Sequence, residues 1–477
     1  MTSEPPTGSG GEPPPQWEEL LRSMFGADAD DAMRELRERG MDPAAMAAAA
    51  GLPDDPQMLG QVLGQVQRML ATSGTGPVNW DVAHDVARQT AAGEGDPTVT
   101  PAEVRAATQA LTVAELWLDA ATDLPPAGGG ARVWSRAEWV EHTLPTWRTL
   151  AEPVASSLSA ALVGALADQL PKGIDGDSVA DGVTAGIDPA QLMRQLGSAV
   201  FGMQVGQAAG TLSREVFGAT DIGLPLIDEP ATVLVPSNVA AFADGLDAPL
   251  EEVRLFLAVR EAAHARLFTH VAWLRGHLLG IVQAYARGIT IDVDSLEEAV
   301  RSIDPTDPAA LQGALSGGVF APHTTPEQQA NLLRLETALA LVEGWVDEVT
   351  AAATIAHLPH AVALREMIRR RRAAGGPAEQ TFATLVGLEM RPRRSRDAAA
   401  LWAEITRSGG PEARDAVWGH PDLLPTTQDL DAPAGYATRR AEAATDDAAM
   451  DRALAEILDA NPDAPDAPDA GPGAAKP

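Results

Sequence analysis

One short run in this chain has the composition of a β-strand, and almost everything else is patterned for helix. The run is ATVLVP, residues 231–236, in which β-branched residues lead to a proline. Elsewhere, Ala- and Leu-rich stretches repeat their apolar residues with a helical period and are separated by Gly and Pro. We therefore expect a mainly α fold with little β-structure, with helices over residues 17–39, 44–71, 80–92, 101–121, 136–168 and 188–217.

Three glycines four residues apart mark one face of the last of these helices. They are Gly202, Gly206 and Gly210, and a row of this kind lets another helix approach closely. The same spacing occurs in membrane helix dimers, but Gln204 and Arg214 interrupt the apolar stretch. The row therefore predicts close helix packing inside a globular protein.

Composition limits the chemistry open to the chain. Its 477 residues have a net charge of −32 and include no cysteine, which excludes thiolate nucleophiles and cysteine-based zinc sites. The acidic balance argues against nucleic acid as a partner, because phosphates would be repelled. The sequence contains no uncharged apolar run of about 18 residues, which is the length that a membrane-spanning helix needs. No membrane span is therefore predicted. The N-terminus lacks the pattern of a secretory signal, so we expect a cytoplasmic protein.

Composition also suggests where the chain divides. Residues 1–16 are rich in Pro, Gly and Ser, and such a segment is expected to be disordered. A helical region is expected over 17–75 and the main domain over 76–440. Residues 441–477 are expected to be helical and then disordered, because they end in a Pro, Asp and Ala tail.

The stretch VREAAHARLF, residues 259–268, is the first candidate for a functional site. It differs by one residue from the zinc motif H-E-x-x-H, because Arg260 stands at the first His position, before Glu261 and His264. A Glu in apolar surroundings can serve as a general base with a raised pKa. The alternative is an Arg–Glu ion pair with a hydrogen-bonded His on an ordinary helix.

A second helix, LETALALVEGWVDEVTAAATIAH, has a polar stripe along one otherwise apolar face. This stripe is either the solvated side of the helix or the source of ligands that complete a metal site with His264. Its members are Glu336, Glu343, Asp347, Thr350, Thr354 and His357.

An arginine-rich block follows at residues 365–396, with nine Arg against three Glu. A nucleic-acid surface is one interpretation, but Phe382 is the block's only aromatic residue for stacking on bases. The block is more consistent with docking onto acidic surface of the same protein or a partner, or with a solvated face.

Four long stretches resemble blocks of the zincin-like metallopeptidase or hydrolase family, which includes many uncharacterised bacterial proteins. They are VLVPSNVAAFADGLDAPLEEVRLFLAVREAAHARLFTHVAWLRGHLLGIVQAYARGI, LETALALVEGWVDEVT, GLEMRPRRSRDAAALWAEI and RDAVWGHPDLLPTTQDLD. The resemblance runs from about Gly76 to about Asp431. It implies a zincin-like helical core within the main domain.

The resemblance also implies a zinc cofactor and roles for particular residues. Glu261 matches the general base and His264 the second His ligand, while Glu343 is the candidate third ligand. Arg260 departs from the pattern, because a guanidinium has no lone pair for a metal. Additional possible ligands are Asp347, His357 and His270.

Two functional hypotheses follow. In the first, the protein is a zinc-dependent metallopeptidase whose metal-activated water attacks a peptide-like bond. In the second, it is a pseudo-metallopeptidase that binds a peptide or protein, with the charge of Arg260 in place of the metal. The sequence leaves substrate and oligomeric state open.

Overall fold

The structure, a computed structural model, describes residues 76–169, 189–288, 325–374 and 394–459. The helices predicted over 17–39 and 44–71 and the disorder predicted at both ends lie outside these ranges. The domain boundaries predicted at residues 76 and 440 stay predictions.

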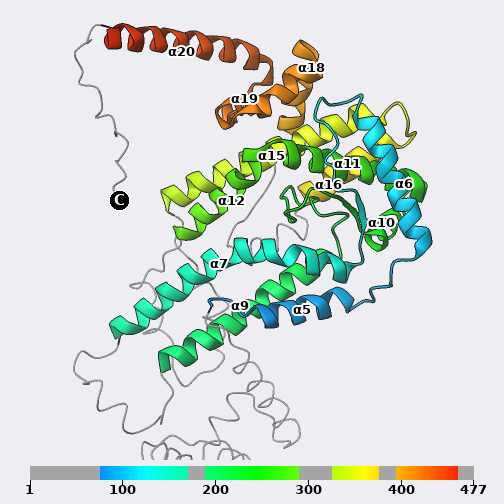
Figure 1. Ribbon diagram of the computed structural model, residues 1–477, viewed down its shortest axis with the longest axis vertical. Helices are drawn as coiled ribbons and strands as arrows, with labels where there is room; N and C mark the ends of the chain where they lie inside the picture. Colours follow the sequence, from blue (N-terminus) through cyan, green and yellow to red (C-terminus); the bar gives the residue numbers. More distant parts are fainter. Residues whose placement is uncertain (1–75, 170–188, 289–324, 375–393, 460–477) are drawn as a thin grey trace, which may run out of the picture.

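The described chain is mainly α, as predicted (Figure 1). Its α-helices are α5 (Trp80–Ala92), α6 (Pro101–Leu118), α7 (Arg136–Gln169), α9 (Pro189–Ser213), α10 (Pro236–Ala243), α11 (Leu250–His270), α12 (Ala272–Arg287), α15 (Pro326–Thr354), α16 (Ala361–Ala373), α18 (Ser395–Ala416), α19 (Thr427–Asp431) and α20 (Tyr436–Asp459). Three short 3-10 turns, Val417–Gly419, Pro421–Leu423 and Pro433–Gly435, join the last helices.

Two three-residue strands form the sheet seen in the described chain. β1 (Ala131–Val133) pairs in parallel with β2 (Thr232–Leu234), so that Ala131 lies opposite Thr232. β2 is buried throughout and confirms the strand predicted at 231–236. β1 was not predicted, because a partly exposed three-residue strand has too short a sequence pattern to be recognised.

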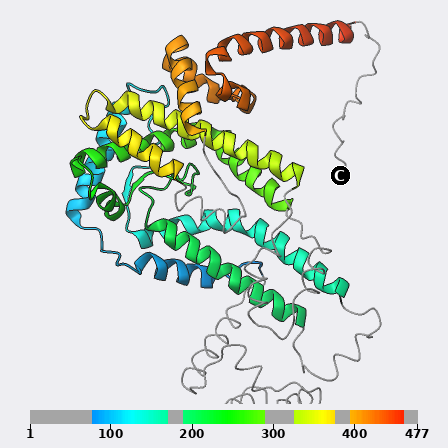
Figure 2. The same cartoon turned by 180° about the vertical axis from the view of Figure 1, so that it is seen from behind.

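The glycine row of α9 packs against α5, as predicted. A Cβ at Gly206 would lie 2.5 Å from the carbonyl oxygen of Ala83, and one at Gly210 would lie 2.5 Å from the Cβ of Thr90. Gly202 similarly meets the backbone at Asn79. Together with α7, these two helices form one layer of the molecule (Figures 1 and 2). Glycine is needed here because the two helix backbones leave no room for side chains.

Helix α11 runs through the centre of the second layer, between α6 and α15. Every side chain from Phe256 to Leu267 is buried, including the charged ones. Arg266 ties α11 to α6, donating from Nε to Glu115 at 2.8 Å and from Nη2 to Asp119 at 2.7 Å. Helix α12 packs against both α7 and α15 and so connects the two layers.

Helix α15 begins at a well-formed cap that fixes its register. The side chain of Thr325 accepts from the backbone N–H of Gln328, whose side chain in turn accepts from the backbone of Thr325, and Pro326 occupies the first helical position. Such a capping box satisfies the free donors of a helix start. The same helix carries Glu343 and packs against α11.

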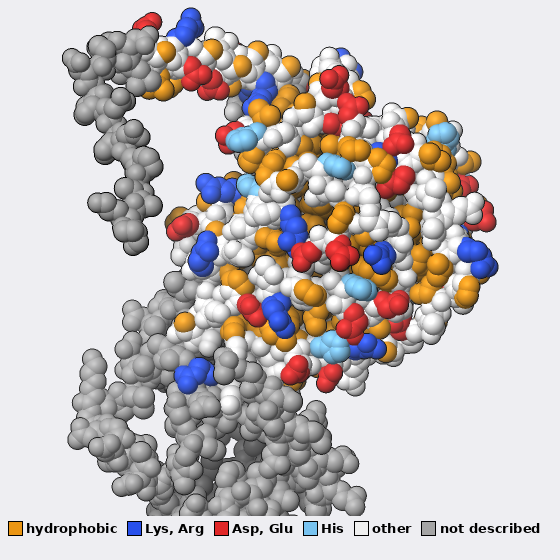
Figure 3. All heavy atoms as spheres, in the orientation of Figure 1, with side chains coloured by type: hydrophobic (Ala, Val, Ile, Leu, Met, Phe, Trp, Pro, Cys, Tyr) orange, Lys and Arg blue, Asp and Glu red, His pale blue; other side chains and the backbone are white. Residues whose placement is uncertain are grey.

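The C-terminal helices lie at one end of the molecule. α18 packs on α15, whereas α20 projects away from the body and its side chains from 441 to 456 are exposed (Figures 1 and 2). On the face drawn in Figure 3, acidic and basic side chains are interspersed. None of the described helices is long and apolar enough to cross a membrane.

Candidate functional site

Two packed helices, α11 and α15, bring three of the predicted site residues together. Arg260 and His264 stand one turn apart on α11 and face Glu343 of α15. All three side chains are at least 95% buried. The polar stripe of α15 therefore lies partly against α11 and is not simply a solvated face, and burying charges there requires partners.

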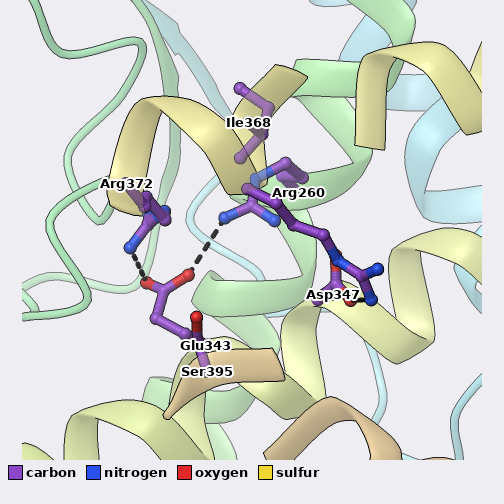
Figure 4. A pocket seen from close by; sticks show the side chains of 7 residues that line it. Arg260, Glu343, Asp347, Ile368, Arg372 and Ser395 are labelled. Carbon is purple, nitrogen blue, oxygen red and sulfur yellow. Dashed lines mark hydrogen bonds and ion pairs between the residues drawn. The ribbon is translucent and has the colours of Figure 1, made fainter. Parts of the chain in front are cut away.

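Glu343 is the centre of the arrangement (Figure 4). Nη2 of Arg260 donates to its Oε2 at 3.1 Å, and Nε2 of His264 lies 3.1 Å from its Oε1. Nδ1 of His264 donates to the carbonyl oxygen of Arg260 at 3.0 Å, which directs Nε2 towards Glu343. The side chains of Arg260 and His264 thus share one carboxylate.

A second guanidinium, which the sequence analysis did not include in the site, reaches the same carboxylate. Nη1 of Arg372, from α16, lies 2.7 Å from Oε1 of Glu343. Burial alone would raise the pKa of Glu343, but the charges of Arg372, His264 and Arg260 hold it well below its usual range. Glu343 is therefore a carboxylate at any pH near neutral.

Glu261 is oriented towards a loop that is separate from this cluster. Its Oε1 accepts from the backbone N–H of Ala219 at 2.9 Å, and its Oε2 accepts from the hydroxyl of Thr220 at 2.6 Å. A Cβ at Gly218 would collide with this carboxyl group, so the loop passes directly over it. Burial raises the pKa of Glu261 to about 7. Arg260 thus pairs with Glu343, whereas loop groups hold Glu261.

The other candidate ligands have different partners. Asp347 accepts from Arg365 at 2.7 Å and from Arg369 at 2.5 Å, and although burial raises its pKa, these two guanidiniums lower it further than burial raises it. His357 stacks on Trp117 with ring centroids 4.5 Å apart. Nε2 of His270 lies 3.2 Å from the carbonyl oxygen of Pro126, at an exposed position. Among the candidate ligands, the structure pairs His264 with Glu343.

The cluster borders a cavity of about 10 Å³, which is close to the smallest volume that admits one water. Three guanidiniums and two carboxylates line it, with one apolar and one hydroxyl side chain (Figure 4). The lining residues are Arg260, Glu343, Asp347, Ile368, Arg369, Arg372 and Ser395. In this conformation the cavity has no room for a peptide.

These donors do not fit the zinc ion that the resemblance implies. A catalytic zinc site takes three protein ligands and keeps one position open, and no group of three or more suitable side chains occurs in the described ranges. In addition, Arg260 and Arg372 already bind both oxygens of Glu343. A divalent cation at Glu343 would meet two fixed positive charges there.

The arginines of α16 are the part of the site that sequence reasoning missed. The block 365–396 was expected either to dock on acidic surface of this protein or of a partner, or to be a solvated face. Three of its described arginines, Arg365, Arg369 and Arg372, dock internally on α15. The available signal was the spacing of Arg365, Arg369 and Arg372, which places three cations on one helix face. Their partners, Asp347 and Glu343, lie on the preceding helix, α15.

A comparison with solved structures finds a protein of similar fold. One solved structure that resembles the chain comes from Chloroflexus aurantiacus and is described, provisionally, as a hydrolase with a novel fold. It is 18% identical, has a TM-score of 0.53, and aligns over 76% of this chain and 98% of its own. At this identity the likeness concerns the fold alone.

No curated protein matches the chain. A family model does match, that of the zincin-like metallopeptidases, over residues 78–437. This match spans about three quarters of the sequence and contains every site residue described above. The chain belongs to the zincin-like metallopeptidase family.

Proposed function

We propose that this chain is a pseudo-metallopeptidase of its family, a module that binds a peptide or protein segment without using a metal. One observation supports this function most directly. Both oxygens of Glu343 are held by guanidiniums, Arg260 at 3.1 Å and Arg372 at 2.7 Å. In the proposed function these two positive charges stand where a metal ion would otherwise balance the carboxylate.

The energetics favour guanidiniums over a metal at this position. A buried carboxylate needs positive charge nearby, since its desolvation is costly. Arg260 and Arg372 supply that charge permanently, because arginine stays protonated at any ordinary pH. A zinc ion would have to displace both side chains and would leave Arg260 buried without its carboxylate partner.

Peptide hydrolysis, the activity named by the family, is the second candidate function. It is favoured by Glu261, a buried carboxyl with a pKa of about 7 that suits proton transfer near neutral pH. The contacts of Glu261 with Ala219 and Thr220 weigh against it, because both oxygens are already engaged. Cleavage of unfolded protein substrates by the wild type, lost in Glu261→Gln, would support this candidate.

The decisive experiment is the zinc content of the purified, tag-free chain. We expect far less than one zinc per chain in the wild type and no change in His264→Ala. About one zinc per chain, lost in His264→Ala but retained in a control His420→Ala at an exposed histidine, would refute the proposal. Circular dichroism of each variant separates loss of metal from loss of fold.

A further inference from the structure

Helix α16 places its arginines in register with the acidic residues of α15. Arg365, Arg369 and Arg372 follow one face of α16 at spacings of four and three. The first two bind Asp347, and the third binds Glu343, one turn away on α15. Figure 4 shows Arg372 directed at Glu343 of α15.

The contact between α16 and the body is largely ionic. Its buried apolar residues are Ala361, Leu364 and Ile368. Arg371 adds a cation–π contact 4.3 Å from the ring centroid of Phe217. The guanidinium-bearing side chains that bind α15 keep 18 to 27% of their surface exposed. A helix held in this way is the kind of element that opens locally without unfolding the core.

The surface of α15 that α16 covers carries carboxylates, and buried carboxylates need cations close by. We define it as the α15 floor, made of Glu343 and Asp347 with Arg260 and His264 behind them. Without α16, two carboxylates would face one fixed guanidinium. Three arginines of α16 therefore meet the two carboxylates of this floor, Arg365 and Arg369 at Asp347 and Arg372 at Glu343.

We propose that the α15 floor is a binding site for an arginine-bearing helical segment of a partner protein, and that α16 is the internal occupant which the partner displaces. The site would bind arginines that are spaced four and three residues apart along a helix, which is the spacing found in α16. This inference rests on the proposed function, because it names the ligand class of the same site. Helix-in-groove recognition of this kind is common among peptide-binding proteins.

Displacement has a measurable consequence. An external helix can bind only those molecules in which α16 has opened. The apparent dissociation constant is therefore the intrinsic one divided by the open fraction, so a firmly docked α16 weakens the apparent affinity. Weakening α16 should therefore strengthen the binding of an external copy. The test is fluorescence anisotropy with a labelled peptide of residues 361–373, AVALREMIRRRRA, added to the full chain.

The full chain with Arg369→Ala and Arg372→Ala should bind this peptide at least about fivefold more tightly than the wild type does, and added salt should weaken the binding. A control with Arg370→Ala and Arg396→Ala has the same net charge but removes cations that bind Glu366 at the surface. This control should bind like the wild type. Adding Asp347→Asn to the Arg369→Ala and Arg372→Ala variant should abolish the gain in peptide affinity.

Three results would overturn the proposal. They are equal affinity of the wild type and the Arg369 and Arg372 variant, equal binding of a scrambled peptide of the same composition, and binding that is indifferent to Asp347→Asn. The scrambled peptide is essential because a chain of net charge −32 attracts any basic peptide. None of these results alters the zinc content, so failure here and failure of the proposed function are distinguishable.

Discussion

Replacing Glu261 by Gln should stabilise the protein at alkaline pH, although Glu261 is buried and hydrogen-bonded. Glutamine has the shape of the protonated carboxylic acid. Its amide oxygen accepts from the backbone N–H of Ala219, and its NH₂ group donates to the hydroxyl of Thr220. The substitution therefore keeps both contacts and removes the buried negative charge.

The magnitude follows from the pKa. Burial raises the pKa of Glu261 from 4.5 to about 7, so the folded state binds this proton more tightly than the unfolded state does. The resulting stability is complete below pH 4.5 and is lost as the pH rises through about 7. The loss amounts to about 3 kcal/mol, since each pKa unit corresponds to about 1.4 kcal/mol.

Urea unfolding followed by circular dichroism at pH 5, 6, 7 and 8 measures this difference. We expect Glu261→Gln to match the wild type within about 1 kcal/mol near pH 5 and to exceed it by about 2 to 3 kcal/mol at pH 8. The reasoning is refuted if the variant is equally destabilised at every pH. That result would mean that the loop at Ala219 requires the carboxylate itself.

The remaining predictions concern packing and charge at other positions. Glu343→Gln should lower the free energy of unfolding by about 3 to 5 kcal/mol at neutral pH, because it leaves the buried guanidinium of Arg260 without its carboxylate partner. This cost should shrink as the pH falls below the ordinary carboxyl pKa, because the unfolded chain then binds a proton at Glu343 while the folded carboxylate stays ionised and paired. Gly206→Ala should cost about 1 to 3 kcal/mol in thermal unfolding, whereas Gly276→Ala, at a helical glycine with open space, should gain up to about 1 kcal/mol. Asp347→Asn should speed hydrogen exchange in α16 and leave α11 unchanged.

Much of the fold could be predicted because its determinants are local. The helices expected at 80–92 and 136–168 occur within a residue of their observed bounds. The glycine row of α9 also indicated its own packing, since three glycines on one face serve a close approach. These features depend on periodicity and residue size, which a single sequence records directly.

The strand β1 and the end of α9 show where local patterns fail. A three-residue strand that pairs with β2, about 100 residues later, carries no periodic signal of its own. The helix expected to reach residue 217 ends at Ser213, where the chain turns to form the loop that covers Glu261. In both places a distant partner decides the local structure.

The candidate site, like the fold, could be predicted only in part from the sequence. The sequence placed Arg260, Glu261 and His264 together in one short motif, but the structure gives Glu261 different partners from the other two. Glu261 turned out to bind a loop 41 residues earlier in the chain through Thr220. Whether Glu261 and His264 have the roles that the family pattern implies stays a prediction.

The charge at the centre of the site has two separate origins, and this affects how the sequence motif should be interpreted. Arg260 is fixed by the burial of α11, whereas Arg372 depends on the docking of α16. A histidine at position 260 would supply an imidazole but would leave a guanidinium 2.7 Å from Glu343. Restoring the H-E-x-x-H pattern alone would therefore not create a zinc site, because α16 would still occupy the carboxylate that the metal requires.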